Sequence, residues 1–190
     1  MVLGEYAYKA RMLWVLMIAF VLWGVDAIGG LNEDLHHAAG SGDLSAVERL
    51  IADGADINAK DQHGATALMM ASAMGNKDVV QLLLTKGSDV NAIDDGGKTA
   101  LLFASVTNEP EVVQLLLGKG AYVNARTNNG GFTALMIASG AGHKEVVQAL
   151  LDNGADVNAK EENGFTALRM ASRIALSLKV GTSQMKKPSS

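Results

Sequence analysis

One stretch of this sequence recurs at a regular interval, and the recurrence limits the fold more than any other feature. Between Asn58 and Asn91 the chain contains, in order, a Gly, Thr-Ala-Leu, Ala-Ser, Val-Val, a Leu triplet, a second Gly and Val-Asn. The same order returns after 33 residues from Gly97 and after a further 34 from Gly131, where the Leu triplet is reduced to a pair. The extra residue of the last copy lies in the loop from Arg126 to Gly130. A period of this length is typical of a solenoid, in which each unit packs only on its neighbours. The sequence therefore predicts a repeat protein.

Each unit carries its own stop and turn signals. A Gly follows the second helical segment, where a left-handed C-terminal cap is needed and Gly adopts it without a steric penalty. A turn-forming pair that ends in Gly marks the tip of each loop between units. The stop residues are Gly54, Gly87, Gly120 and Gly154, and the turn pairs are His63-Gly64, Asp95-Gly96, Asn129-Gly130 and Asn163-Gly164.

Two short helices, a Gly stop, a Val-Asn-Ala turn and a Gly-x-Thr-x-Leu restart together resemble the ankyrin repeat, roughly from Asn32 to Ser172. The resemblance implies an all-α solenoid that serves as a binding scaffold without a shared chemistry. One departure is systematic, because Thr-Ala-Leu stands where the family favours Thr-Pro-Leu-His. We expect the fold to survive, since Ala is a good helix former, and the loops to be held less tightly. The residues in place of the His are Met69, Leu102, Met136 and Arg169.

The pattern predicts four full helix-turn-helix repeats and a C-terminal half-repeat cap, within a domain over residues 28–180. In the first repeat, from Asn32 to Lys60, Asn32 is expected to cap the first helix at its N-terminus. In the third, Asn108 replaces a Gly and Pro110 begins the second helix, which suits both residues. From Arg173 the pattern stops, and residues 181–190 are expected to be a disordered tail. We favour a monomer.

Residues 1–27 do not belong to the repeats. Lys9 and Arg11 precede an apolar run from Met12 to Val25, and small residues up to Ala27 suit a signal peptidase. The run has 14 residues, whereas a membrane span needs about 20. We therefore favour a cleaved signal peptide over an uncleaved membrane anchor, and both export the repeats. A buried apolar helix on the first repeat is a third interpretation.

Composition excludes several classes of function. The formal net charge is −4 at pH 7, without the clustered Lys and Arg that displace counterions from nucleic acid, so we expect neither DNA nor RNA as a partner. The chain has no Cys, which excludes disulfides, thiolate metal sites and a Cys nucleophile. No serine elbow, phosphate-binding Gly loop or His-Glu-x-x-His motif is present. We therefore predict no catalytic, cofactor or metal site, and not an enzyme.

The four His residues suit structural roles better than chemistry. His36 and His37 are adjacent, so on a helix they point about 100° apart and cannot both bind one metal ion. His36 and His143 occupy positions where the resembled family often has His, which implies a structural role. His63 lies at a loop tip, where contact with solvent is favoured over contact with a partner.

The resemblance also implies where a protein partner binds. In the family, partners meet the loop tips and the exposed end of each first helix, which together form a concave strip. In this chain the strip consists of Gln62, His63, Met74, Asp95, Lys98, Val106, Thr107, Asn128, Asn129, Phe132, Glu162, Asn163, Phe165 and Arg173, with Ala65, Ala73, Ala141 and Ile174 between them.

Phe132 and Phe165 stand out in this strip, because each directly precedes a helix-starting Thr. Equivalent positions in neighbouring repeats predict two aromatic side chains side by side. Exposed aromatics ringed by polar residues are typical of interface anchors. The alternative is that both rings fold onto their own loops and brace the Gly-rich turns.

Together these observations predict an exported, non-catalytic protein-binding scaffold, similar to ankyrin-repeat proteins that bacteria place in the periplasm. A membrane-tethered accessory subunit of an envelope enzyme or transporter is the alternative if residues 12–25 stay uncleaved. A secreted effector that binds a host protein differs only in destination. The expected location is periplasmic or secreted, or else anchored to the cytoplasmic membrane with the repeats outside.

Overall fold

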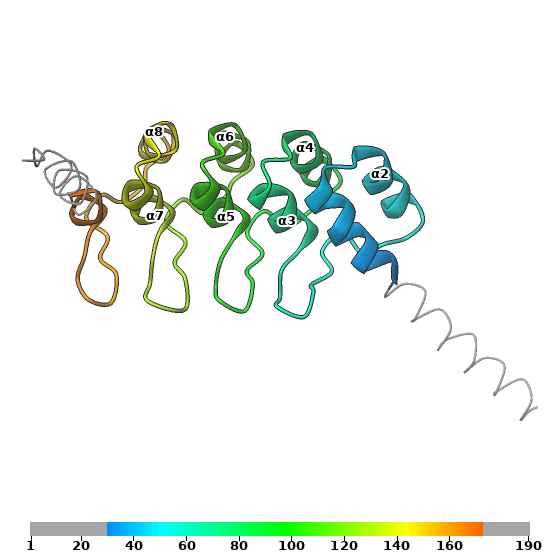
Figure 1. Cartoon of the computed structure of the whole chain (residues 1–190), viewed down its shortest axis with the longest axis horizontal. Coiled ribbons are helices and arrows are strands. Elements are labelled where there is room, and N and C mark those ends of the chain that lie inside the picture. The colour runs from blue at the N-terminus through cyan, green and yellow to red at the C-terminus, as the bar shows by residue number, and fades with distance from the viewer. Residues whose placement is uncertain (1–29, 173–190) are drawn as a thin grey trace, which may run out of the picture.

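The structure is a computed structural model that describes residues 30–172. The predicted signal segment, both predicted domain boundaries, the C-terminal tail and Arg173 lie outside these residues. Within them the chain is all-helical and contains no strand. Successive helix pairs stack in one row (Figure 1), as the repeat period predicted.

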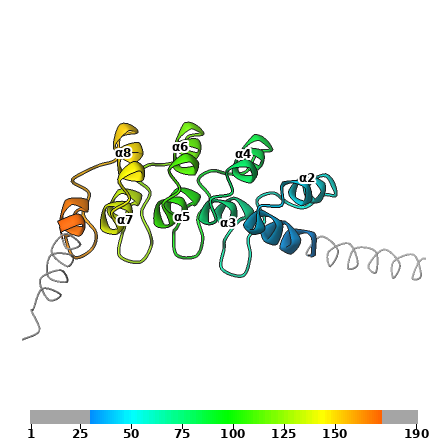
Figure 2. The same ribbon diagram turned by 45° about the horizontal axis from the view of Figure 1, so that its top comes forward.

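Each repeat contributes one helix to each of two layers (Figures 1 and 2). The inner layer contains a helix over residues 30–41, then α3 (Ala67–Ala73), α5 (Ala100–Thr107) and α7 (Ala134–Ala141). The outer layer contains α2 (Leu44–Ala52), α4 (Lys77–Thr85), α6 (Pro110–Gly118) and α8 (Lys144–Asp152). A fifth inner helix starts at residue 167 and is described as far as residue 172. Loops project from the inner layer on the side away from the outer helices.

The inner helices begin at a repeated Thr. Thr66, Thr99 and Thr133 have extended backbones, and their hydroxyl oxygens accept the N–H of the residue three positions later at 3.3–3.4 Å. This is an N-cap, and it satisfies one of the free N–H groups at the helix start. Ala follows each Thr and extends the helix, so the missing Pro does not prevent helix formation.

The departure from Thr-Pro-Leu-His has a packing reason. Met69, Leu102 and Met136 stand where the family has His, and each is only 1% exposed. They lie in one continuous core with the Val and Leu residues of the outer helices. At these positions the chain therefore replaces a polar side chain with buried apolar volume, which stabilises the stack through the hydrophobic effect.

The third repeat confirms two expectations about its inter-helix turn. Asn108 adopts a left-handed conformation, with φ of 63°, and Asn tolerates this region better than most residues. Pro110 is the first residue of α6, where its missing N–H has no helical acceptor in any case.

The expected N-cap at Asn32 is wrong. The helix already includes residue 30 and runs to residue 41, so Asn32 lies inside it. Its side-chain oxygen instead accepts the backbone N–H of Asp56 at 2.8 Å. The local sequence suggested a cap, but the long-range turn provides the donor.

The same type of contact recurs further along the chain, where it joins one repeat to the next. Side-chain oxygens of Asn58, Asn91 and Asn124 accept backbone N–H groups of the following repeat, each at 2.8 Å. We call Asn32, Asn58, Asn91 and Asn124 the asparagine ladder. Because solenoid units contact only their neighbours, these bonds help to set the register of one unit on the next.

Candidate partner-binding surface

The projecting loops are short hairpins that close in the same way. The first residue of each hairpin donates its N–H to the carbonyl of the last, at 2.9–3.1 Å. These pairs are Asp61 with Ala65, Asp94 with Lys98, Thr127 with Phe132, and Glu161 with Phe165. The fourth-repeat hairpin spans one residue more than the others, which agrees with the insertion inferred from the sequence.

The side chain of the first residue then fixes the hairpin from within. Asp61 Oδ1 accepts the N–H groups of His63 and Ala65, both at 2.8 Å. Burial raises the pKa of Asp61, but these hydrogen bonds and the nearby His36 and His63 outweigh it and hold the pKa below its usual value. The carboxylate is therefore ionised at neutral pH.

Glu161 has the same role in the last hairpin. Its Oε1 accepts the N–H of Phe165 at 2.9 Å, and its Oε2 accepts the side-chain amide of Asn163 at 3.0 Å. The Phe165 bond is the main reason that the pKa of Glu161 is lowered. In the longer fourth-repeat loop, Thr127 takes the place of the acid and its hydroxyl accepts the N–H of Phe132.

Neighbouring hairpins are tied to each other by their backbones. Asp95 N–H donates to the His63 carbonyl, Asn128 N–H to that of Gly96, and Glu162 N–H to that of Gly130, at 2.8–3.1 Å. These bonds connect the loop tips from the second repeat to the fifth. They link neighbouring loops, as the His that this chain lacks would do in the family.

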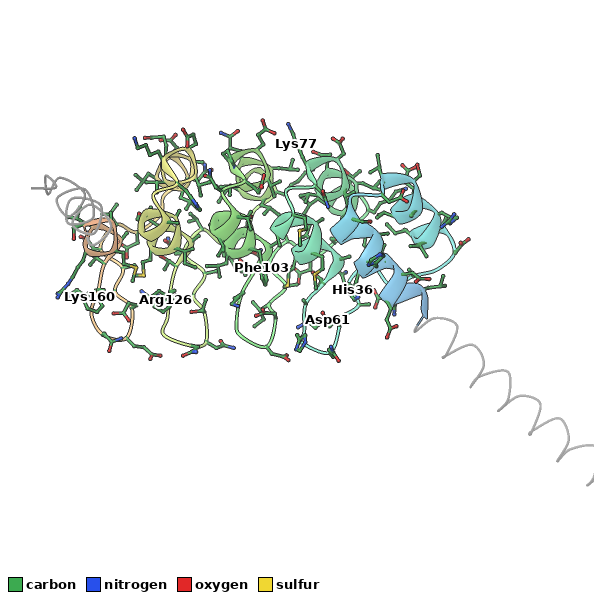
Figure 3. The ribbon with its side chains drawn as sticks, in the orientation of Figure 1. His36, Asp61, Lys77, Phe103, Arg126 and Lys160 are labelled. Atoms are coloured by element: carbon green, nitrogen blue, oxygen red, sulfur yellow. The ribbon has the colours of Figure 1, made fainter. Side chains whose placement is uncertain are left out.

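Two basic side chains add longer ties. Lys60 Nζ donates to the carbonyl of Ile93 at 2.7 Å, and Arg126 Nη1 donates to that of Lys160 at the same distance. Figure 3 shows Arg126 and Lys160 at the bases of adjacent loops. The loops therefore form a hydrogen-bonded row.

Most of the predicted strip is exposed, as a binding surface requires. The exposed members are Gln62, His63, Met74, Asp95, Lys98, Val106, Thr107, Asn128, Asn129, Glu162 and Asn163. Phe132 and Phe165 are half-buried. Ala65 is a correction, because it is only 6% exposed and belongs to the core. Its N–H is bound by Asp61, which draws the residue inward.

The two aromatic residues of the strip have different surroundings. The ring of Phe132 folds onto its own loop, where a Cβ built on Gly130 would lie 2.5 Å from Cε2 of the ring. The same ring packs against the core. Phe165 instead lies under the guanidinium of Arg169, with 4.3 Å from Cζ to the ring centroid. Phe132 thus has the contacts expected of a brace.

The strip also contains exposed apolar side chains on or next to the inner helices. Met74 and Val106 are 65% and 52% exposed, and sequence reasoning placed both in the strip. Phe103 is half-buried, with the Lys98 ammonium 5.5 Å from its ring centroid, and it lies on the inner layer above the loops (Figure 3). Sequence reasoning missed Phe103, although it lies three residues before Val106 and therefore on the same face of α5.

Two of the His residues have the structural roles that were expected. His36 Nε2 donates to the carbonyl of Ala59 at 2.9 Å, and His143 Nδ1 donates to that of Ser105 at 3.1 Å. The His36 bond joins the two ends of the first repeat, and the His143 bond joins the fourth repeat to the third. Within residues 30–172, no three His, Asp or Glu residues group as metal ligands. In the same part of the chain, no helix is both long and apolar enough to cross a membrane.

Comparison with known proteins matches the same repeats that the structure describes. A family model for ankyrin repeats in three copies matches residues 35–127, and one for ankyrin repeats in many copies matches residues 122–171. A rice protein (Oryza sativa subsp. japonica) named as a probable E3 ubiquitin-protein ligase is 45% identical over 65 residues. That match covers 34% of this chain but 12% of the rice protein.

Two Rickettsia felis proteins described as ankyrin repeat proteins are each 48% identical over 42 residues, or 22% of this chain. The matches cover 67% and 64% of those proteins. Together, the two family-model matches span most of the described repeats, and they agree with the helix pairs, the Thr caps and the hairpins seen in the structure. This chain belongs to the ankyrin-repeat family.

Proposed function

We propose that this chain is a non-catalytic scaffold that binds a protein partner through its loop tips and the adjoining face of its inner helices. Ankyrin repeats indicate protein–protein interaction in general. The position of the binding surface is argued from two exposed apolar side chains on neighbouring repeats, Met74 at the end of α3 and Val106 on α5. Both belong to the strip predicted from the sequence, which also contains the exposed polar residues of the hairpins. An apolar centre with a polar rim is typical of interfaces.

The hairpin row supports this proposal energetically. Binding is weakened when loops must be ordered at the moment of contact. Here the backbone bonds between the hairpins and the Asp61 and Glu161 side chains order the loops in advance. The ligase activity in the name of the rice relative describes that protein and is not proposed for this chain.

Two Val residues of equal exposure offer a matched test. Val106 is 52% exposed on the inner face, whereas Val157 is 53% exposed in the turn after α8. Proteins captured from an extract on the full chain are identified by mass spectrometry and then tested against Val106→Gln and Val157→Gln. We expect a genuine partner to bind the Val157→Gln protein as it binds the unchanged chain, and to fail to bind the Val106→Gln protein. Equal retention of both variants would argue against this face.

We further propose that the repeats act outside the cytoplasmic membrane. Lys9 and Arg11 followed by the apolar run from Met12 to Val25 support export. The test is the intact mass of the protein in separated periplasm, membrane and cytoplasm of an expressing bacterial cell. A soluble periplasmic species that starts near Ile28 is the expected result. A full-length species in the membrane would favour the tethered subunit, and a full-length cytoplasmic species would contradict export.

A further inference from the structure

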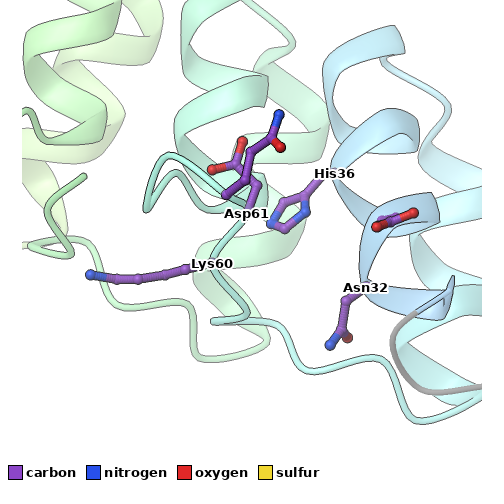
Figure 4. A pocket seen from close by; sticks show the side chains of 6 residues that line it. Asn32, His36, Lys60 and Asp61 are labelled. Atoms are coloured by element: carbon purple, nitrogen blue, oxygen red, sulfur yellow. The ribbon is translucent and has the colours of Figure 1, made fainter. Parts of the chain in front are cut away.

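Two pockets lie next to each other where the first inner helix meets the hairpin of the second repeat. The first has a volume of about 480 Å³ and is lined by Asn32, Glu33, His36, Lys60, Asp61 and Gln62 (Figure 4). The second has about 520 Å³ and is lined by Glu33, His36, His37, Gly40, Ser41, Met70 and Met74. We call them the acidic pocket and the methionine pocket. They share Glu33 and His36, so they form one continuous hollow.

The acidic pocket has a negative lining. Glu33 is exposed and makes no ion pair within residues 30–172. Asp61 uses Oδ1 for the hairpin, and Oδ2 has no donor in the same part of the chain. The one formal cation of the lining, Lys60, extends away from His36 (Figure 4), and its ammonium binds the Ile93 carbonyl in the next repeat.

The lining therefore has acceptors but lacks a matching cation. Asn32 and His36 are already used, because the Asn32 oxygen accepts the Asp56 N–H and His36 Nε2 donates to Ala59. Two carboxylates that face one hollow attract a cationic group and repel an anionic one. A guanidinium or an ammonium on a flexible stem has the charge and the donors that such a hollow requires.

The methionine pocket adds an apolar contact directly beside these charges. Met74 is 65% exposed, Met70 is half-buried, and Gly40 leaves the space above Met70 without a side chain. Met side chains are flexible and polarisable, and they adapt to apolar groups of different shape. A ligand that fills both pockets needs a positive charge close to an unbranched or γ-branched apolar group.

We propose that these two pockets bind one peptide segment of a partner protein, with a Lys or Arg side chain in the acidic pocket and a neighbouring Leu or Met side chain in the methionine pocket. The proposal rests on the protein-binding function above and deepens it, because it names the chemistry of the partner. It also names a specific contact at the junction of the first and second repeats, whereas Val106 lies in the third.

The test uses random peptides displayed on phage, panned on the immobilised full chain. We expect the bound peptides to be enriched in Lys or Arg within a few positions of Leu or Met. A labelled synthetic copy of one such peptide then gives affinities by fluorescence anisotropy. Glu33→Gln is expected to weaken binding about threefold to fivefold, as for an exposed ion pair. Glu48→Gln, on the exposed face of α2, is the matched control and should leave the affinity unchanged.

A coupling measurement separates the ion pair from a general loss of fold. When Gln replaces the cationic residue of the peptide, the Glu33→Gln effect is expected to disappear, because the two changes remove the same interaction. Met74→Ala is expected to weaken the same peptide severalfold, whereas Val157→Ala is not. Full additivity, no enrichment of cationic residues, or failure to enrich any peptide would each overturn the two-pocket proposal. Loss of a captured partner on Val106→Gln would still support the scaffold function in any of those cases.

Discussion

The side chain of Asn91 binds the following repeat through both of its polar atoms. Its oxygen accepts the backbone N–H of Tyr122 at 2.8 Å, and its amide donates to the carbonyl of Gly120 at 3.1 Å. One residue in the turn that closes the second repeat thus connects this repeat with the end of the third outer helix, α6, and the turn that follows it. Such a contact stabilises the interface between units, on which the cooperativity of a solenoid depends.

Asn91→Ala is therefore expected to lower the free energy of unfolding by about 1 to 2 kcal/mol, since it removes two hydrogen bonds at a repeat interface. Asn91→Asp keeps the acceptor for Tyr122 and loses the donor to Gly120, so its loss should be smaller. Urea unfolding followed by circular dichroism measures both. Equal losses for Ala and Asp would show that the Tyr122 bond contributes nothing.

Two equivalent Ser residues are expected to respond to Ala with opposite signs. Ser105 Oγ donates to the Leu101 carbonyl at 2.7 Å, whereas the buried Ser72 Oγ has no hydrogen-bond partner within residues 30–172. Ser72→Ala should raise the free energy of unfolding by about 0.5 to 1 kcal/mol, because Ala removes an unpaired buried hydroxyl and has the higher helix propensity. Ser105→Ala should lower it by a similar amount. Thermal unfolding of the pair gives the comparison, and a loss of stability in Ser72→Ala would contradict it.

The surroundings of the two aromatic residues predict different roles. Phe132 packs on Gly130 and on the core, so Phe132→Ala is expected to cost about 1.5 to 3 kcal/mol, less than a fully buried Phe. Phe165 contacts Arg169, so Phe165→Ala should cost about 1 kcal/mol or less. Denaturant unfolding measures both changes. A Phe132→Ala protein of unchanged stability that loses its partner would favour the anchor interpretation.

Stability is expected to fall in mild acid through Asp61 and Glu161. Both pKa values are lowered in the folded protein from reference values of 3.8 and 4.5. As the pH falls, the unfolded chain therefore takes up these protons first, and the balance shifts toward unfolding. The stabilising contribution is complete above about pH 5 and is lost as the pH falls through 4.5 and 3.8 toward the folded values. Urea midpoints between pH 3 and pH 7 measure the slope.

The double variant Asp61→Asn, Glu161→Gln provides the control for this pH dependence. It removes both titrations while keeping a side-chain oxygen near each hairpin. We expect a lower stability at neutral pH and a shallower fall below pH 5, because fewer protons are taken up on unfolding. An unchanged slope would assign the acid sensitivity to other carboxylates.

The local signals of this sequence were enough for the repeat architecture. A Thr that caps a helix, a Gly that ends one and a Val-Val or Leu-Leu pair that faces the core each act within a few residues, and their period shows how many units stack. Asn108 and Pro110 were interpreted correctly for the same reason, because a left-handed turn and a helix start are local conformations.

Contacts between segments that lie far apart in the sequence depended on tertiary structure. Asn32 is a residue type that commonly caps helices, but its side-chain oxygen accepts the N–H of Asp56, in a turn that only the folded chain brings close. Ala65 was assigned to the exposed strip, yet it is buried in the core that the helices of several repeats share. The acidic pocket combines Glu33 and Asp61 from different repeats, so no spacing rule within one helix could have found it.

By itself, then, the sequence determined the family and the number of described helix pairs, because these follow from short-range conformational preferences repeated at one period. Only the tertiary structure decided which polar atoms are already satisfied and which remain free to bind. Whether Lys60 faces Asp61 or the Ile93 carbonyl is settled by a neighbouring unit whose position no single repeat specifies. Whether Phe132 faces solvent or packs on Gly130 and the core is settled by how its own loop folds against the inner helices.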